Sequence, residues 1–226
     1  MKATALARYA LRLLLTLAVW AFIVGTMAGR WDWARGWVFV GWTVCAQVAS
    51  TFVIWRFRPD LLERRTRMGP GTVRWDRALV VAYQLATYGI AIVGAGTAGR
   101  HGEDLPLALW PLGAALYTAG IAWATWALAV NRHFEPTVRL QTDQGHTVVD
   151  AGPYRFVRHP GYLGGMVGLP GLALMLGSTH ALIPATIAVL LLFVRTAAED
   201  RFLHRNLEGY AAYAARVRSR LLPGMW

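Results

Sequence analysis

Cysteine is nearly absent from this chain of 226 residues, since Cys45 is its single example. A disulfide bond within the chain is therefore excluded, and so is a metal site made of several cysteines. Because Cys45 lies inside an apolar run, we expect a small core or lipid-facing residue. His133, His146, His159 and His180 lack the spacing of zinc ligands, so we expect no metal site.

Charged residues are also few: they make up 15% of the chain, against about 25% in an average soluble domain. Acidic residues are scarcer than basic ones, 12 against 23, which gives a net charge of +11. A basic protein can bind nucleic acid, but no stacking platform or binding motif accompanies these arginines, and we expect no such partner. Hydrophobic residues, by contrast, reach 56%, which indicates a membrane protein.

The apolar residues fall into five uncharged runs: Leu13–Ala28, Gly36–Trp55, Ala78–Gly99, Leu105–Val130 and Gly161–Val194. The first four each fit one membrane helix, which needs roughly 20 residues, although the first run is short. That first run resembles a signal peptide ending near Ala28. Because further apolar segments follow it, we interpret it as the first membrane segment.

The fifth run is too long for one span, since a single helix would extend roughly 50 Å. It is interrupted at Gly177-Ser178-Thr179-His180 and again at Pro184, residues at which a helix can turn. We therefore predict two short spans, about Tyr162–Leu176 and Ala181–Ala197, joined as a tight hairpin. This gives about six membrane segments. Five spans plus a re-entrant pair is the alternative.

Basic residues support this count, because positively charged loops stay on the cytoplasmic side of a membrane. With the N-terminus inside, Arg30, Arg35 and Arg100 lie outside. The other 20 basic residues are cytoplasmic: Lys2, Arg8, Arg12, Arg56, Arg58, Arg64, Arg65, Arg67, Arg74, Arg77, Arg132, Arg139, Arg155, Arg158, Arg195, Arg201, Arg205, Arg216, Arg218 and Arg220. The sequence thus predicts an all-α, polytopic membrane helix bundle with cytoplasmic termini and a cytoplasmic C-terminal helix.

Polar residues gather in the C-terminal part, whereas the spans before Val130 are nearly free of titratable groups. Ion-coupled transporters usually carry ionisable residues within their spans, so that class is disfavoured. We expect residues 1–130 to form a four-span membrane region. Residues 131–226 would carry the site in a cytoplasmic loop, the helical hairpin and a C-terminal helix, and both regions would form a single integrated domain.

The segment Gly152–Gly164, GPYRFVRHPGYLG, is dense in polar residues, prolines and glycines at a membrane boundary. An interfacial turn would explain each residue singly, but not their density. Irregular backbone at this depth must be buried or line a cavity, where its N–H and C=O groups can face a ligand. We interpret this segment as one half of a binding site.

A second polar cluster follows the last apolar run. Arg195 and Glu199 are four residues apart, so their side chains share one face of a helix. An ion pair at the helix end is the simpler interpretation. The alternative is that Glu199 and Asp200, opposite Arg158 and His159, hold a cationic or hydroxyl-bearing ligand.

These clusters resemble the motifs of the isoprenylcysteine carboxyl methyltransferase family, which belongs with the membrane phospholipid methyltransferases. Gly152–Gly164 is similar to its G-x-Y-x-x-x-R-H-P-x-Y-x-G motif. The tail resembles its R-x-x-x-E-E…Y-x-x-Y…P ending through Arg195, Glu199, Asp200, Tyr210, Tyr213 and Pro223. Asp200 departs from the pattern, which has a second Glu there. The resemblance is strongest over residues 131–226. Residues 58–64, 75–77, 131–134 and 138–141 resemble the bacterial branch, which implies a bacterial inner or plasma membrane.

The resemblance implies an enzyme, a methyltransferase that binds S-adenosylmethionine on the cytoplasmic side. The implied cofactor-binding residues are Gln141, His146, Thr147, Val148, Val149, Tyr154, His159, Pro160, Gly161, Tyr162 and Glu199. Arg195 would bind the substrate, and Arg195, Glu199 and Arg158 are the candidate catalytic residues. Aromatic faces and a carboxylate suit a cationic sulfonium, and an arginine binds a carboxylate or phosphate by two parallel hydrogen bonds.

The implied acceptor is a membrane lipid or a hydrophobic small molecule that receives the methyl group on oxygen, nitrogen or sulfur. A carboxylate, as in isoprenylcysteine, is already ionised and needs no protein base, so alignment would supply most of the rate. Prenylated cysteine, an amine headgroup and a smaller hydrophobic molecule all stay open. The alternative functions are a membrane reductase of the steroid 5α-reductase or sterol reductase type, using NADPH, and a non-enzymatic scaffold.

Overall fold

The computed structural model describes residues 3–64, 71–141, 144–224 and 226, which form helices and loops but no strand. Its long helices are α1 (Ala3–Ala28), α2 (Ala34–Phe57), α4 (Arg74–Gly94), α5 (Trp110–Val130), α6 (Pro160–Leu176) and α7 (Leu182–Asn206). Short helices are α3 (Pro59–Arg64) and α8 (Tyr210–Arg216), with a π turn at Ala95–Gly99 and 3-10 turns at Leu107–Leu109 and Gly152–Arg155. The all-α prediction is confirmed. Arg65 and Arg67 lie outside the described residues.

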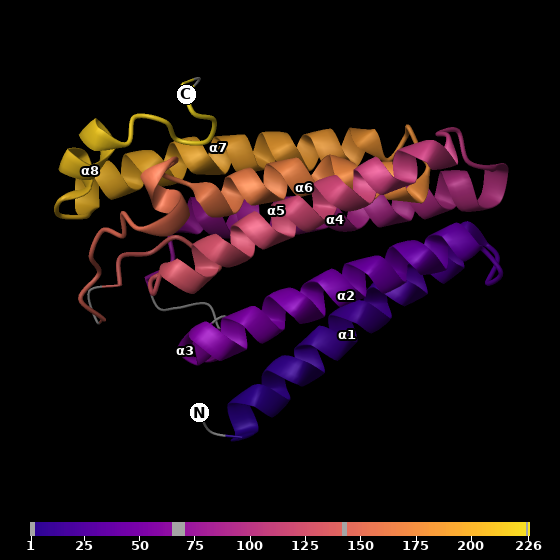
Figure 1. Cartoon of the computed structure of the whole chain (residues 1–226), viewed down its shortest axis with the longest axis horizontal. Coiled ribbons are helices and arrows are strands. Elements are labelled where there is room, and N and C mark those ends of the chain that lie inside the picture. The colour runs from indigo at the N-terminus through magenta and orange to yellow at the C-terminus, as the bar shows by residue number, and fades with distance from the viewer. Residues whose placement is uncertain (1–2, 65–70, 142–143, 225) are drawn as a thin grey trace.

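The helices run up and down along one axis (Figure 1). Helices α4 to α7 form a bundle, and α1 and α2 lie along one side of it. Both termini, α3, α8 and the loop after α5 lie at one end, whereas the connections after α1, α4 and α6 lie at the other. This arrangement places the strongly basic segments at a common end, as the charge pattern predicted. Which side of a membrane that end faces stays a prediction.

Helices α6 and α7 form the hairpin that the sequence predicted within the fifth apolar run. Helix α6 ends at Gly177, whose φ of +78° lies in the left-handed region that glycine adopts without steric cost. The chain reverses there, and α7 begins at Leu182. Helix α7 then continues to Asn206, beyond the expected end at Ala197, so Arg195 and Glu199 lie on the same unbroken helix as the last apolar span.

Membrane crossing is supported for fewer segments than the sequence predicted. Four helices within the described residues are long and apolar enough to cross a membrane: α2, α4 with its π turn, α5 with the 3-10 turn before it, and α7. The apolar part of α1, Leu13–Ala28, and helix α6 are shorter. Six helices thus occupy the places of the six expected segments, and four of them meet the length and composition of a span.

Helices α5 and α6 approach each other closely through glycines. A Cβ atom at Gly120 would lie 2.3 Å from the carbonyl oxygen of Gly164, and one at Gly171 would lie 2.4 Å from that of Gly113. Small residues permit such backbone contact between helices in lipid, where packing replaces the hydrophobic effect. This contact fixes the start of α6 against α5, and with it the position of Tyr162.

Arg35 joins α2 to the last turn of α6, at the end of the bundle opposite the termini. Its Nε and Nη2 atoms donate to the carbonyl oxygens of Met175 and Leu174, at 2.8 and 2.9 Å, and Nη1 pairs with Glu103 at 3.1 Å. These carbonyls belong to the last turn of α6, where helix carbonyls have no partner within the helix. Arg35 is therefore a buried tie between α2 and α6 rather than a surface loop charge.

Candidate active site

A pocket opens at the end of the bundle that carries both termini. Counting its open mouth, it holds about 810 Å³ of empty space. Its walls come from the loop after α5, the first turn of α6, the later part of α7, and α8. The lining residues are Asn131, His133, Phe134, Glu135, Thr137, Val138, Arg139, Gln141, His146, Thr147, Val148, Val149, Tyr154, Arg158, His159, Gly161, Tyr162, Arg195, Glu199, Leu203, Leu207, Tyr210 and Tyr213.

Nearly every site residue named from the sequence lies in this lining. The exception is Pro160, which is buried in the first turn of α6, where its missing N–H costs no hydrogen bond. Arg158, Arg195 and Glu199 also line the pocket. The fold thus gathers residues from both motifs around one space, while the role of each stays a prediction.

Gln141 and His133 organise the loop wall of the pocket. The Gln141 side chain is 2% exposed, and its Nε2 donates to the carbonyl oxygen of His133 at 2.7 Å. The His133 Nε2 atom accepts hydrogen bonds from Arg132 Nε at 3.0 Å and from the Thr147 N–H at 3.4 Å. Since Nε2 accepts, the neutral ring carries its proton on Nδ1, which faces the Gln141 Oε1 atom at 3.4 Å.

His146 lies against His133, with ring centroids 4.5 Å apart. Partial burial and, to a smaller extent, the neighbouring His133 and Arg139 lower the pKa of His146 to about 4. Its Nδ1 atom accepts the Gln141 N–H at 3.4 Å. His146 is therefore a neutral ring at physiological pH, with its Nε2–H as the donor.

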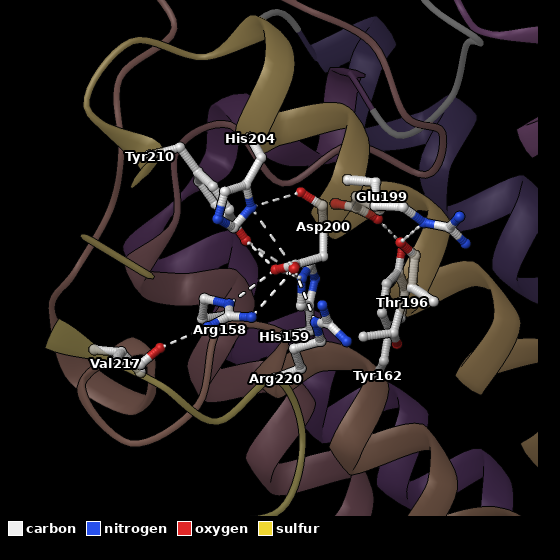
Figure 2. Close-up of polar contacts among 12 residues, drawn as sticks. Arg158, His159, Tyr162, Thr196, Glu199, Asp200, His204, Tyr210, Val217 and Arg220 are labelled. Carbon is white, nitrogen blue, oxygen red and sulfur yellow. Dashed lines mark hydrogen bonds and ion pairs between the residues drawn. The ribbon is translucent and has the colours of Figure 1, made fainter. Parts of the chain in front are cut away.

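Arg158 points its guanidinium toward Asp200 of α7 and toward the tail, the segment that follows α7 (Figure 2). Its Nε and Nη2 atoms donate to the two carboxylate oxygens of Asp200 at 2.8 and 3.1 Å. Its Nη1 atom donates to the carbonyl oxygens of Val217 and Arg218, both at 2.9 Å. These contacts use most of the donors of Arg158, so its geometry is that of a residue that positions the tail against α7.

Asp200 is the centre of this network, with 1% of its side chain exposed. Besides Arg158, it accepts hydrogen bonds from Tyr210 Oη at 2.8 Å and Arg220 Nε at 2.9 Å, and His159 Nε2 lies 3.3 Å away (Figure 2). Burial and the charge of Asp200 raise the pKa of Tyr210, so Tyr210 stays a hydroxyl donor. Asp200, the residue that departs from the family pattern, is thus the buried anchor of the tail.

Glu199 takes a different direction from its neighbour Asp200. Its Oε2 atom accepts a short hydrogen bond from the hydroxyl of Tyr162, and Figure 2 shows the two side chains meeting. Among the described side chains, no arginine or lysine pairs with Glu199. The Tyr162 ring stacks on His159 at 5.8 Å between centroids, and the guanidinium of Arg195 lies 5.1 Å from its centre.

Arg195 is bound to Asp76 of α4. Its Nε and Nη2 atoms donate to the two oxygens of Asp76 at 2.7 and 3.2 Å, and Nη2 also donates to the Pro136 carbonyl at 2.7 Å. The completely buried Asp76 accepts the Val138 N–H as well, at 2.7 Å. We expected Arg195 to bind the acceptor by two parallel hydrogen bonds. Neither edge of its guanidinium has two free N–H groups for such a pair of bonds. Nη1 alone has no partner among the described residues.

Sequence reasoning missed Asp76 and much of the loop wall as site residues. Within the wall these include Asn131, His133, Phe134, Glu135, Thr137, Val138 and Arg139, and the C-terminal end of α7 adds Leu203 and Leu207. Asp76 lay within a stretch that resembled the family, but nothing assigned it a role. Its signal was an acidic residue at the start of an apolar run, which is costly in a membrane unless a cation pairs with it.

Known proteins resemble the part of the chain that builds this pocket. Residues 112–205 match the model of the isoprenylcysteine carboxyl methyltransferase (ICMT) family. Two probable protein-S-isoprenylcysteine O-methyltransferases, from Oryza sativa subspecies indica and japonica, are each 28% identical over 96 residues, 42% of this chain and 50% of theirs. The cobalt-zinc-cadmium resistance protein CzcN of Cupriavidus metallidurans is 31% identical over 122 residues, 53% of this chain and 50% of CzcN.

The chain spans about half the length of the curated relatives it matches. The matched segment 112–205 holds most of α5, the loop wall, α6 and most of α7, and so most of the pocket lining. The matched family and the two Oryza relatives are named as methyltransferases, so the reductase alternative is not favoured. Residues 112–205 of the chain are therefore similar to the isoprenylcysteine carboxyl methyltransferase family.

Proposed function

We propose that this chain is a membrane methyltransferase that uses S-adenosylmethionine and transfers its methyl group to a lipid-like or hydrophobic acceptor. The observation that carries the proposal is the convergence of both family motifs on one pocket, in which Glu199 has no cationic partner among the described side chains. Glu199 is half-buried, and a carboxylate that is partly removed from water is disfavoured when no cation pairs with it. A cationic ligand would relieve that cost.

The residues of the pocket fit the cofactor. S-adenosylmethionine carries a sulfonium, an ammonium and a carboxylate, so its net charge is positive. Glu199 and the faces of Tyr162 and His159 would hold the cationic part, and the loop wall with Val148 and Val149 offers an apolar surface for the adenine. When bound, the cofactor supplies an electrophilic methyl group on a positively charged sulfur.

The acceptor would approach from the membrane side of the pocket. Arg195 and Tyr162 lie where α7 and α6 leave the apolar bundle, and outward-facing residues of α7, among them Leu190, Phe193 and Val194, are exposed. A lipid-like molecule can keep its tail beside these spans while its polar group reaches Nη1 of Arg195. The Oryza relatives are named for protein-S-isoprenylcysteine, which makes a prenylated cysteine one candidate acceptor.

Calorimetry on the purified full chain in detergent tests this function. We expect S-adenosylhomocysteine, the demethylated product, to bind and NADPH not to bind. The variant Glu199→Gln should weaken the binding of S-adenosylmethionine, whereas Glu208→Gln, at an exposed position of the tail outside the lining, should not. Binding of NADPH without binding of either adenosyl compound would instead support the reductase.

A further inference from the structure

A second hollow lies on a different face of α7 from the candidate active site. Helices α4 and α7 run in opposite directions, so the start of α4 lies beside the end of α7 at the basic end of the bundle (Figure 1). This hollow, the α4–α7 groove, holds about 650 Å³ of empty space, counting its open mouth. Its lining residues are Trp75, Ala198, Arg201, Phe202, Arg205 and Asn206. None of these six residues lines the candidate active site.

Two arginines of the groove carry charge that no side chain neutralises. Arg201 and Arg205 are four residues apart, share one face of α7 and are exposed. Arg201 donates from Nε to the Ala197 carbonyl of its own helix, at 3.1 Å, and no carboxylate among the described side chains pairs with either arginine. Arg74 and Arg77, in the first turn of α4, are also exposed and have no carboxylate partner in the described part of the chain. Four guanidinium groups therefore give this part of the surface a positive field.

The nearby carboxylates do not cancel this field. Asp76 and Asp200 are buried, and each binds an arginine of the candidate active site. Glu199 lies in the lining of that site, where it accepts the hydroxyl of a tyrosine. Glu208, exposed after the end of α7, forms no ion pair with Arg205 within the described residues. The α4–α7 groove therefore suits an anionic ligand.

Aromatic side chains form part of the groove as well. Trp75 and Phe202 line it and are half-buried. The indole N–H of Trp75 has no acceptor among the described residues, so it can donate to a ligand. Tryptophan favours the boundary between lipid headgroups and hydrocarbon, because its ring is apolar and its N–H is polar. Arginine, for its part, binds phosphate by parallel N–H bonds. Donors for a phosphate thus lie beside an apolar surface.

An exposed apolar stripe on α7 leads to these arginines. Its members are 48–62% exposed: Ile183, Ile187, Leu190 and Val194. Their spacing of three or four residues continues through Ala198 to Arg201 and Arg205, so the stripe and both arginines lie on one face of the helix. Helix α7 is long and apolar enough to cross a membrane. A molecule with an anionic head and apolar chains can follow this face along its length.

We propose that the α4–α7 groove binds the phosphate headgroup of one anionic phospholipid, whose acyl chains lie along the exposed stripe of α7. Basic residues beside any membrane attract anionic lipids diffusely. Here two unpaired guanidinium groups, an indole N–H and an apolar stripe meet at one hollow, which favours a single bound molecule. The lipid is a ligand outside the candidate active site, so this inference does not depend on methyl transfer.

Bound lipid also stabilises the contact between α4 and α7. Trp75 precedes Asp76, whose carboxylate binds Arg195 of α7, and the other lining residues of the groove belong to α7. A ligand that binds the folded chain and not the unfolded chain raises the free energy of unfolding. We therefore expect an anionic phospholipid to raise the melting temperature of the chain in detergent, and a zwitterionic one with the same acyl chains to raise it less.

A titration of the full chain in neutral detergent, followed by native mass spectrometry, tests the site. The lipids are dioleoylphosphatidylglycerol and dioleoylphosphatidylcholine, which share their chains and differ in headgroup charge. We expect one phosphatidylglycerol to bind at least about tenfold more tightly than phosphatidylcholine. The double variant Arg201→Gln/Arg205→Gln should lose that preference and the associated rise in melting temperature. Equal affinity of both lipids for the wild-type chain overturns the proposal.

A second double variant separates a specific site from diffuse attraction. Arg56→Gln/Arg218→Gln removes the same charge from two exposed positions at the same end of the bundle, outside the groove lining. It should bind phosphatidylglycerol as the wild-type chain does. If both double variants lose affinity equally, the attraction is diffuse and the site does not exist.

Inorganic phosphate distinguishes a lipid site from a plain anion site. At the same concentration as the lipid, it should not displace bound phosphatidylglycerol, because the acyl chains add apolar contact that phosphate lacks. Displacement of the lipid by phosphate would overturn the assignment of a phospholipid.

Both outcomes are independent of methyl transfer and of the binding of S-adenosylhomocysteine, so failure here leaves the proposed function untouched.

Discussion

Arg195 and Asp76 lie 119 positions apart in the sequence, yet the Arg195 Nε atom donates to the Asp76 Oδ1 atom at 2.7 Å. The pair joins α4 to α7, and the Val138 N–H bonded to Asp76 adds the loop wall of the pocket. Asp76 therefore holds in place the arginine that we expect to meet the acceptor.

The first prediction concerns this pair. Asp76→Asn leaves the Arg195 charge buried without its partner, which typically costs about 3–5 kcal/mol. We expect a loss of that order in the free energy of unfolding, measured by chemical denaturation in detergent. Asp150→Asn is the control, because its pair with Arg216 is about 60% exposed and exposed pairs contribute roughly 0–1 kcal/mol. Equal losses in both variants would contradict the assignment.

A second prediction separates cofactor binding from acceptor alignment at Arg195. Arg195→Lys keeps the positive charge but has one nitrogen, which cannot hold Asp76, the Pro136 carbonyl and an acceptor together. We expect nearly normal affinity for S-adenosylhomocysteine and methyl transfer at least about tenfold slower, equivalent to roughly 1.4 kcal/mol. Arg218→Lys, exposed in the tail, should keep full turnover. Unchanged turnover in Arg195→Lys would leave Arg195 with a structural role alone.

For Arg158 we predict an effect on binding rather than on the rate at saturation. Arg158→Lys loses the paired bonds to Asp200 and the bonds to the Val217 and Arg218 carbonyls. Unsatisfied buried groups cost about 1–3 kcal/mol, so thermal stability and cofactor affinity should fall. At saturating cofactor the rate should change little, as expected of a positioning residue. A large fall in kcat with unchanged cofactor affinity would instead make Arg158 catalytic.

His146 yields a prediction about pH. Its pKa is lowered to about 4 in the folded chain, against an ordinary value of 6.5. As the pH falls from about 6.5 to about 4, the unfolded chain takes up a proton that the folded chain does not, so the free energy of unfolding decreases. NMR titration of the His146 ring should give a midpoint well below 6.5. In His146→Gln, this part of the acid destabilisation should disappear.

The last prediction tests the topology. Reporter fusions after Gly145 and at the C-terminus should report the cytoplasm, because those segments lie at the basic end of the bundle. Fusions after Gly102 and Thr179, which are exposed in connections at the opposite end, should report the outside. An outside signal at the C-terminus together with a cytoplasmic one at Gly145 would mean that α6 and α7 do not both cross.

Sequence by itself determined the helices and the identity of most pocket residues. In lipid, a long apolar run can pair its backbone N–H and C=O groups within the same segment only as a helix. Glycine at position 177 permits the left-handed turn after α6. Both features depend on the local sequence alone. The two motifs carry Tyr154 to Tyr162 and Arg195 to Glu199, and the same resemblance named Gln141 and residues 146–149, which share one pocket with them. That α6 crosses the membrane stays a prediction, because its 17 residues place it among the shorter apolar helices.

Only the tertiary structure decided which charges are bound and which stay available. Sequence spacing placed Arg195 and Glu199 on one helix face, and that invited an ion pair between them or a free arginine for the acceptor. Packing of α4 against α7 instead brought Asp76 to Arg195, while Tyr162 took Glu199. Such pairings depend on distances between helices far apart in sequence and on burial, which removes competing water, so no local pattern could reveal them.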